Sequence, residues 1–452
     1  MDKPFLDKLR KIDPYVPGEQ PQAADIIKLN ANENPYPPAP CVQEILRRFD
    51  AAQLALYPDA NGKALKSTLA GRFGVKPAQV FLGNGSDDVL ALAFQAFFCS
   101  DRPVLYPDIT YSFYPVWCNL FRIPYETVPL DGDFRVRVRG YDQPNGGVIL
   151  PNPNAPTGRG VTLDFLEDLL QHNQDCVVII DEAYVDFGAQ SAVPLLGKYE
   201  NLLVVQTMSK SRSLAGMRIG YALGSEVLIS TLEAVKNSYN SYTMDVLALA
   251  AGQASVEDER YFQETCRRVA ETRDRSAAAL RGLGFTVLPS LTNFLFVTHP
   301  KKEAPVIFEY LRQKISIFAI SGCRASKIIC ALRSARTNRW TGCSTRCKHF
   351  CKAARICRLH PCCQKTRAAE SRGTSFPILL SPAPNALPAW PPAPLSQSRR
   401  AARHWCPKPQ ARPAHSRSGR APRAACAGSW LPAGVFCPGS AASRCIRETQ
   451  HG

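Results

Sequence analysis

Short apolar runs with strand character recur between residues 79 and 210, and helical stretches separate them. The runs are QVFLG (79–83), PVLYP (103–107), GVILPNP (147–153), CVVIIDEAY (176–184) and NLLVVQTMSK (201–210). Between them lie stretches such as DDVLALAFQAFF (87–98) and LDFLEDLLQHN (163–173). Apolar strands that alternate with helices are typical of a mainly parallel sheet with helices on both faces. The sequence therefore predicts an α/β protein.

The pattern changes twice along the chain. A long helical stretch at about 244–282 leads to GFTVLPSLTNFLFVTH (284–299), which we interpret as the start of a smaller α+β domain. Beyond Lys314 the periodicity stops, and from about residue 375 the composition is rich in Pro, Ala and Arg, which predicts disorder. We expect an N-terminal arm (1–32), a large domain (33–243), a truncated small domain (244–314) and an aberrant tail (315–452).

The positive charge of the chain is confined to that tail. The formal net charge is +17, yet residues 315–452 hold 23 Lys and Arg against two acids, Glu370 and Glu448. Residues 1–314 hold 32 basic and 36 acidic residues. One hypothesis is a basic nucleic-acid-binding protein on an inactive enzyme scaffold. It predicts salt-sensitive DNA binding that is lost when residues 315–452 are removed.

Cysteine usage and the N-terminus bear on localisation. Residues 1–314 hold five of the 17 cysteines, scattered as in proteins of a reducing compartment. The N-terminus has no apolar core of signal-peptide length, and no run approaches membrane-spanning length. We expect a cytoplasmic protein without specific membrane or nucleic-acid partners.

Two motifs follow predicted strands directly. DEAY (181–184) comes after four apolar residues, so Asp181 is expected at the carboxyl edge of a central strand, where open parallel sheets bind ligands. PNPNAPTG (151–158) leaves another strand in a turn of Pro and Asn. An Asp in such a place can also be only a cap.

Two further motifs combine polar groups near strand ends. TMSKSRSLAGMRIGY (207–221) brings together Ser209, Lys210 and Arg218, although a Ser-Lys pair after a strand is usually an ordinary loop. GNGSDD (83–88) is a glycine-rich turn entering a helix, and backbone N–H groups in such a turn can cradle an anion. Alone, it is equally an ordinary N-capped helix start.

In this order, the motifs resemble the fold-type I pyridoxal-phosphate-dependent aminotransferases. Within that group they are similar to the histidinol-phosphate aminotransferase family over roughly residues 5–314. The stretches that carry the resemblance are KLNANENPYPP (28–38), LYPDANGKALKSTLA (56–70), FLGNGSDDVL (81–90), ILPNPNAPTG, IIDEAYVDF and QTMSKSRSLAGMRIGY. The resemblance implies a large domain with a mainly parallel seven-stranded sheet, a smaller α+β domain, and pyridoxal 5′-phosphate as cofactor.

The resemblance also implies roles for five residues around the cofactor ring. Lys210 would form the Schiff base with the cofactor aldehyde and later move a proton. Asp181 would pair with the pyridinium nitrogen and keep it protonated. Tyr184 and Asn154 would hydrogen-bond the ring oxygen, and Tyr111 would stack on the ring.

The cofactor phosphate would lie at a helix start. The resemblance assigns it to the backbone and side chains of Gly85, Ser86 and Asp87, with Ser209 and Arg218 completing the cup. No metal is expected at this site.

Two tyrosines outside these motifs receive roles by the same resemblance. Tyr57 would reach the phosphate of the neighbouring subunit, which implies a homodimer, and Tyr15 on the N-terminal arm would cover the substrate. For both, plain aromatic packing is the alternative. Asn32 and Glu33 belong to the family signature, but the sequence assigns them no role.

The implied reaction converts imidazole-acetol phosphate and L-glutamate to L-histidinol phosphate and 2-oxoglutarate in histidine biosynthesis. The alternatives are a related aminotransferase for aromatic amino acids and an enzyme like threonine-phosphate decarboxylase, which shares the cofactor core.

The family's substrate-binding arginines are expected after EYLRQK (309–314), near an RYF-like stretch and in a motif like LRITIGTD, and neither is present. When codons for Lys327–Ser344 are read one base early, they permit (N/D)(Y/H)LRITIGTD(K/E)QMDRLLD. We therefore expect that the chain leaves the ancestral frame between about Lys314 and Phe318, and that its activity is impaired. Resequencing the locus tests this hypothesis.

A zinc or nucleic-acid module is the functional alternative for the tail. The spacings do not form a paired CxxC pattern, so we do not expect a metal site. The candidate ligands are Cys343, Cys347, Cys351, Cys357, Cys362, Cys363, His349 and His360.

Overall fold

The computed structural model describes residues 4–17, 27–313, 316–317, 319–320 and 330–333. Its centre is a seven-stranded sheet of strand order β2-β8-β7-β6-β5-β3-β4. Only β8 runs antiparallel to its neighbours; the remaining pairs are parallel. The predicted α/β fold with a mainly parallel seven-stranded sheet is confirmed. The strands are β2 (Val80–Gly83), β3 (Val104–Pro107), β4 (Tyr125–Val128), β5 (Gly147–Pro151), β6 (Val178–Asp181), β7 (Leu202–Thr207) and β8 (Gly220–Gly224).

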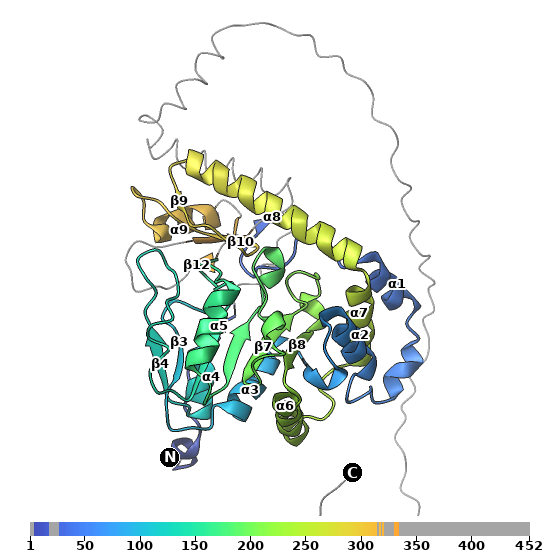
Figure 1. Cartoon of the computed structure of the whole chain (residues 1–452). Coiled ribbons are helices and arrows are strands. Elements are labelled where there is room, and N and C mark those ends of the chain that lie inside the picture. Colours follow the sequence, from blue (N-terminus) through green and yellow to red (C-terminus); the bar gives the residue numbers. More distant parts are fainter. Residues whose placement is uncertain (1–3, 18–26, 314–315, 318, 321–329, 334–452) are drawn as a thin grey trace, which may run out of the picture. The chain divides into compact units, whose positions relative to one another are not determined.

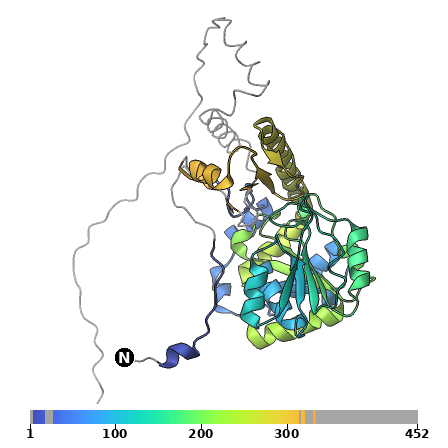
Figure 2. The same cartoon turned by 90° about the vertical axis from the view of Figure 1, so that its left-hand side faces the viewer.

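Both faces of this sheet are buried, because successive side chains of a strand point to opposite sides. In β6, Val178 and Ile180 enter one hydrophobic cluster and Ile179 enters the other. Figures 1 and 2 show helices on either side of the strands. One cluster includes α1 (Pro40–Arg48), α2 (Lys63–Phe73), α5 (Leu163–His172) and α7 (Val246–Glu257); the other includes α3 (Ser86–Phe97), α4 (Phe113–Phe121) and α6 (Glu226–Tyr239).

The helical stretch expected at about 244–282 is two helices rather than one. α7 ends at Glu257, and α8 (Glu259–Gly282) begins after Asp258. The Asp258 carboxylate accepts a hydrogen bond of 3.1 Å from the N–H of Tyr261, which satisfies a donor that a helix start leaves unpaired. The cap therefore fixes the break between the two helices.

A smaller antiparallel sheet lies beside α8 and α9 (Ala304–Gln313) in Figure 1. Its strand order is β12-β13-β10-β9, and Leu280, Leu295 and Ile307 belong to its hydrophobic core. Two of its strands, β12 and β13, come after residue 314, and a separate pair of strands, β1 and β11, runs in parallel. The bounds are β1 (Ile27–Lys28), β9 (Thr286–Val287), β10 (Phe294–Thr298), β11 (Ser316–Ile317), β12 (Ala319–Ile320) and β13 (Cys330–Arg333).

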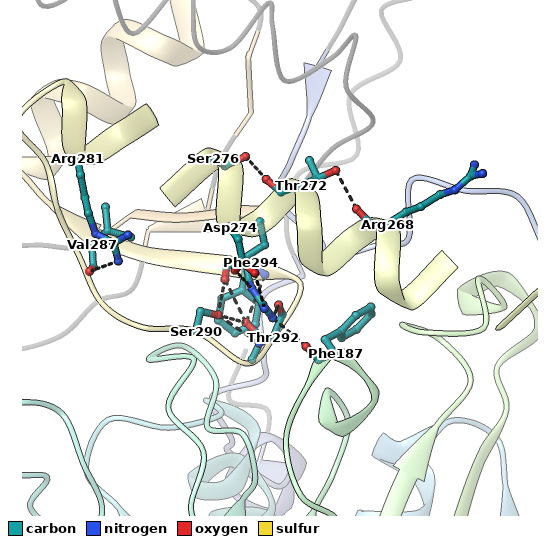
Figure 3. A network of polar contacts seen from close by, with 11 residues as sticks. Phe187, Arg268, Thr272, Asp274, Ser276, Arg281, Val287, Ser290, Thr292 and Phe294 are labelled. Atoms are coloured by element: carbon teal, nitrogen blue, oxygen red, sulfur yellow. Dashed lines mark hydrogen bonds and ion pairs between the residues drawn. The ribbon is translucent and has the colours of Figure 1, made fainter. Parts of the chain in front are cut away.

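A buried arginine on α8 ties the small sheet to the loop after β6. The guanidinium of Arg273 donates to the carbonyl oxygens of Phe187, at 2.9 Å, and Thr292, at 3.0 Å. Figure 3 shows Phe187 and Thr292 facing this helix from two different loops. Phe187 follows β6 of the large sheet and Thr292 precedes β10 of the small sheet, so Arg273 links the two sheets.

Short 3-10 helices complete the described secondary structure. They are η1 (Pro4–Lys8), η2 (Ala51–Ala55), η3 (Pro77–Gln79), η4 (Val185–Phe187), η5 (Val193–Leu195) and η6 (Ala215–Met217). Among the described helices, none combines the length and the apolar character needed to span a bilayer.

Candidate active site

A pocket opens where β5, β6 and β7 end, at the carboxyl edge of the sheet. It includes about 600 Å³ of space, part of which is open solvent at its mouth. Most of the residues that the sequence singled out therefore meet in one place. The lining residues are Ser86, Asp87, Tyr111, Pro151, Pro153, Ala155, Asp181, Ala183, Tyr184, Thr207, Ser209, Lys210 and Arg218.

Asp181 is the last residue of β6 and is only 5% exposed. Its carboxylate accepts hydrogen bonds from the Tyr114 hydroxyl, at 2.8 Å, and from the N–H of Ala183, at 3.1 Å. Burial raises the pKa of Asp181 to about 6, against these two hydrogen bonds. No cation within the described part of the chain forms an ion pair with it. A buried carboxylate that lacks an ion-pair partner is stabilised when a ligand brings a cationic group to it.

The glycine-rich turn predicted as an anion cradle enters α3. Gly85 precedes this helix with φ +89°, a conformation that L-residues rarely adopt, and offers no side-chain cap. A Cβ on Gly85 would come within 2.4 Å of Nη2 of Arg218. A Cβ on Gly220 would lie 2.4 Å from the backbone nitrogen of Ser86. The first N–H groups of α3 and the Arg218 guanidinium therefore stand close together, as an anion site requires.

Two pocket residues, Asp87 and Tyr111, make side-chain contacts beside the start of α3 and Arg218. Asp87 Oδ2 lies 3.5 Å from Nη2 of Arg218, and Asp87 Oδ1 accepts a hydrogen bond of 2.9 Å from Tyr111. Burial and the Asp87 carboxylate raise the pKa of the Tyr111 phenol. Tyr111 therefore stays neutral and presents its ring to the pocket.

Lys210 also lines the pocket, three residues after β7. Its Nζ donates to the carbonyl oxygen of Ala31, at 3.1 Å. The Asn34 amide donates to the carbonyl oxygens of Lys210 and Ser211, at 2.9 and 3.1 Å. The segment before α1 therefore holds both the backbone and the amine of this lysine.

Asn154 and Ser209 differ in their relation to the pocket, because only Ser209 lines it. Asn154 is 1% exposed, and its amide donates to the Ile109 carbonyl and the Thr157 hydroxyl, at 2.9 and 3.0 Å. In this arrangement its side chain braces the turn after β5 rather than lining the pocket. Ser209 lines the pocket, and its hydroxyl accepts a hydrogen bond of 3.0 Å from Thr207.

The two tyrosines assigned by resemblance alone do not line the pocket. Tyr57 is 82% exposed and stacks on Tyr242 with ring centroids 4.5 Å apart. Tyr15 stacks on Phe113, at 4.3 Å. Burial raises the pKa of Tyr15, and the Asp87 carboxylate adds to the shift, so the phenol lies near the pocket.

The sequence assigned no role to several residues that shape the site. Tyr114 contacts Asp181, and Asn32 contacts Tyr184, whose ring also packs edge-on against Phe294. Tyr114 lies in the first turn of α4, three residues after Tyr111, which precedes this helix. Asn32 had no comparable spacing, because its partner lies 152 residues away.

The arrangement fits a specific type of ligand. The helix start and Arg218 suit a phosphate, and the buried carboxylate of Asp181 suits a protonated ring nitrogen. Lys210 supplies an amine and Tyr111 an aromatic face at the same pocket. These groups fit pyridoxal phosphate. The clusters of cysteine and histidine weighed as zinc ligands lie outside the described residues.

Comparisons with known proteins agree with this description. The family described as aminotransferase class I and II matches residues 24–337. A histidinol-phosphate aminotransferase 2 of Dechloromonas aromatica is 53% identical over 318 residues, which are 70% of this chain and 89% of that protein. A histidinol-phosphate aminotransferase of Acinetobacter baumannii is 53% identical over 310 residues, or 68% of this chain and 86% of that protein.

Solved structures share the fold. The histidinol-phosphate aminotransferase of Sinorhizobium meliloti, solved in complex with pyridoxal-5′-phosphate, superimposes with a TM-score of 0.66 at 24% identity. The match covers 72% of this chain and 91% of that chain.

Proposed function

The chain belongs to the class I and II aminotransferases, and from this premise we propose that it is a histidinol-phosphate transaminase. The reaction is imidazole-acetol phosphate plus L-glutamate to L-histidinol phosphate plus 2-oxoglutarate. Relatives with 53% identity that bear this name support the assignment. The single observation that carries it is that Asp181, Lys210 and the start of α3 line one pocket at the carboxyl edge of the sheet.

Pyridoxal phosphate is the cofactor of this family, and it supplies an aldehyde for the substrate amine and a ring that withdraws electrons from the reacting carbon. Lys210 is proposed to hold the cofactor at rest and then to move a proton at the substrate carbon, because its amine reaches the pocket. Asp181 is proposed to bind the ring nitrogen and hold its proton.

The phosphate of the cofactor is proposed to bind at the start of α3. Ser86 and Asp87 would supply backbone N–H groups there, and Arg218 and Ser209 would supply side-chain donors. Gly85 would line the site with its backbone, because its own N–H donates to the carbonyl oxygen of Gly83 at 2.8 Å. The glycine at 85 supports this role, since a side chain would displace Arg218. Charge-assisted hydrogen bonds from a guanidinium suit a phosphate.

The remaining ring contacts are also proposals. Tyr184 would donate to the ring oxygen, Tyr111 would stack on the ring, and Tyr15 would cover the substrate from the arm. Asn154 would contact the ring oxygen only after its amide exchanges one of its present partners, Ile109 or Thr157.

We propose that the chain acts as a homodimer in which Tyr57 reaches the neighbouring site. The support is a set of exposed large apolar side chains close in sequence to Tyr57 and Tyr242, whose rings stack. Leu54, Leu56 and Tyr239 are 60%, 75% and 77% exposed, and such clusters mark interaction surfaces.

Three further expectations remain proposals. The division at residues 32, 243 and 314 is one, and the cytoplasmic location is another, supported by five free cysteines in the described residues. The third is that transamination is impaired because the arginines expected to bind the substrate are missing after residue 314. Comparing this chain with one carrying the restored reading frame tests it; equal activity would contradict it.

Substrate kinetics test the proposed function. We expect the highest kcat/KM with histidinol phosphate and 2-oxoglutarate, compared with L-phenylalanine and with threonine phosphate. Preference for phenylalanine would indicate an aromatic aminotransferase, and release of carbon dioxide from threonine phosphate would indicate a decarboxylase. Either result would overturn the assignment.

A further inference from the structure

Asn32 joins three parts of the molecule at the edge of the pocket. It stands between β1 and α1 with φ +51°, a left-handed conformation that asparagine tolerates better than most residues. Its side-chain amide donates to the hydroxyl oxygen of Tyr184, at 3.1 Å. Its carbonyl oxygen accepts a hydrogen bond of 3.0 Å from the amide of Asn293, which is 1% exposed.

The hydrogen bond to Tyr184 has a direction. An amide N–H can only donate, so the phenol oxygen accepts and its own hydrogen points elsewhere. In the described part of the chain, the Tyr184 hydroxyl has no second hydrogen-bond partner. Because Tyr184 lines the pocket, its O–H is left to donate to a ligand there.

The ring of Tyr184 is held on other sides as well. It packs edge-on against Phe294 with ring centroids 5.1 Å apart, and Nζ of Lys210 lies 5.7 Å from its centre. These contacts fix the ring plane but leave the hydroxyl hydrogen free to rotate. The amide of Asn32 therefore supplies the contact that selects its direction.

The same short segment also holds the lysine. Ala31, the residue before Asn32, accepts the hydrogen bond from Nζ of Lys210, and Asn34 binds the Lys210 carbonyl. One backbone segment thus sets the positions of both the amine and the phenol.

We infer that Asn32 is a positioning residue that turns the Tyr184 hydroxyl toward the bound cofactor. The inference rests on the proposed function and adds a residue to its site. An O–H donated to the ring oxygen stabilises the anionic form of that oxygen. Loss of the Asn32 amide leaves Tyr184 in place with its hydrogen free, so this stabilisation weakens.

Two substitutions distinguish the effect of the Asn32 side-chain amide from that of its backbone conformation. N32G keeps the left-handed conformation, which glycine adopts readily, and removes the donor. N32D keeps the shape but replaces the donor with an acceptor, which draws the Tyr184 hydrogen away from the pocket. Should N32G fold poorly, N32D alone carries the test.

The readout is the pH midpoint of the visible absorption band of bound pyridoxal phosphate. We expect N32G to raise this midpoint by about 0.5 pH unit, the size of a weak hydrogen bond, and N32D to raise it more. Y184F should raise it as well. In the double variant N32G/Y184F, the midpoint should equal that of Y184F, because Asn32 acts only through the phenol.

An equal effect of N32G in the wild-type chain and in the Y184F variant would assign Asn32 a purely structural role and overturn the inference. An unchanged midpoint in N32G and N32D would overturn it too. If the wild-type chain forms no visible band, the proposed function fails separately. The cofactor-free chain then tests the contact between Asn32 and Tyr184 by NMR. The tyrosine ¹³Cζ resonance that is absent in Y184F belongs to Tyr184, and N32G should shift it. An unchanged resonance would contradict the contact.

Discussion

The Tyr114 hydroxyl donates a hydrogen bond of 2.8 Å to the Asp181 carboxylate, and both residues are buried. This contact lowers the pKa of Asp181, whereas burial raises it to about 6. Tyr114 thus helps a carboxylate at the end of β6 to remain ionised where water is excluded.

Replacing Tyr114 with Phe should weaken cofactor binding at least 10-fold, because a hydrogen bond to a charged group contributes about 1.5–3 kcal/mol and about 1.4 kcal/mol is a factor of ten. Equilibrium titration with pyridoxal phosphate measures the dissociation constant. Y106F is the matched control: the buried Tyr106 hydroxyl belongs to the same cluster and has no described hydrogen-bond partner. An equal loss in both variants would contradict the role of Tyr114.

Glu182 should make the cofactor-free chain less stable as pH rises. Burial raises its pKa from 4.5 to about 7, although hydrogen bonds from Ala192, Ser191 and Gln206 oppose this shift. The folded chain therefore binds more protons than the unfolded chain between about pH 4.5 and 7, and the free energy of unfolding falls as pH rises through this window.

E182Q should flatten this dependence, measured by denaturant unfolding at several pH values. Some slope should remain between about pH 4 and 6, because Asp181 also has a raised pKa. An unchanged slope in E182Q would show that Glu182 does not titrate in this window.

Gly85→Ala should reduce cofactor affinity at least 10-fold. The added Cβ would meet Nη2 of Arg218 at 2.4 Å, and alanine is strained at φ +89°. The effect on the phosphate site is measured as the ratio of the dissociation constants of pyridoxal and pyridoxal phosphate. Gly71→Ala is the control: it lies in α2 with open space around its Cβ position, and it should raise stability by about 1 kcal/mol without changing affinity. Full affinity in G85A would contradict the phosphate site.

Leu56→Glu should convert a homodimer to monomers, because it places a charge in an exposed apolar group near Tyr57. Sedimentation velocity measures the change. Val227→Glu, on the exposed side of α6 at 71% exposure, is the control and should leave assembly unchanged. A wild-type chain that sediments as a monomer would refute the dimer.

The central strands could be predicted because burial on both faces leaves a continuous apolar run, as in 178–180 of β6. Two strands of the seven-stranded sheet escaped prediction for physical reasons. β4 lies at the edge of the sheet and exposes three of its four residues, so it lacks such a run. β8 is a short antiparallel strand inside the motif that carries Lys210, and its glycines do not indicate a strand.

The site was partly predictable by the same logic. Strand ends meet at one edge of a parallel sheet, so Asp181, Lys210 and the loop after β5 converge. Side-chain partners were not predictable, because they join distant segments: Asn32 reaches Tyr184 and Tyr114 reaches Asp181. Local periodicity does not indicate which of two close asparagines, Asn32 or Asn34, contacts the Tyr184 hydroxyl.

The identity of the lysine that holds the cofactor tests the account most directly. The holoenzyme is treated with borohydride, which makes a lysine–cofactor linkage permanent, and its peptides are analysed by mass spectrometry. We predict the phosphopyridoxyl group on the peptide containing Lys210 and its loss in K210A. Modification of another lysine, or of none, would contradict the proposal.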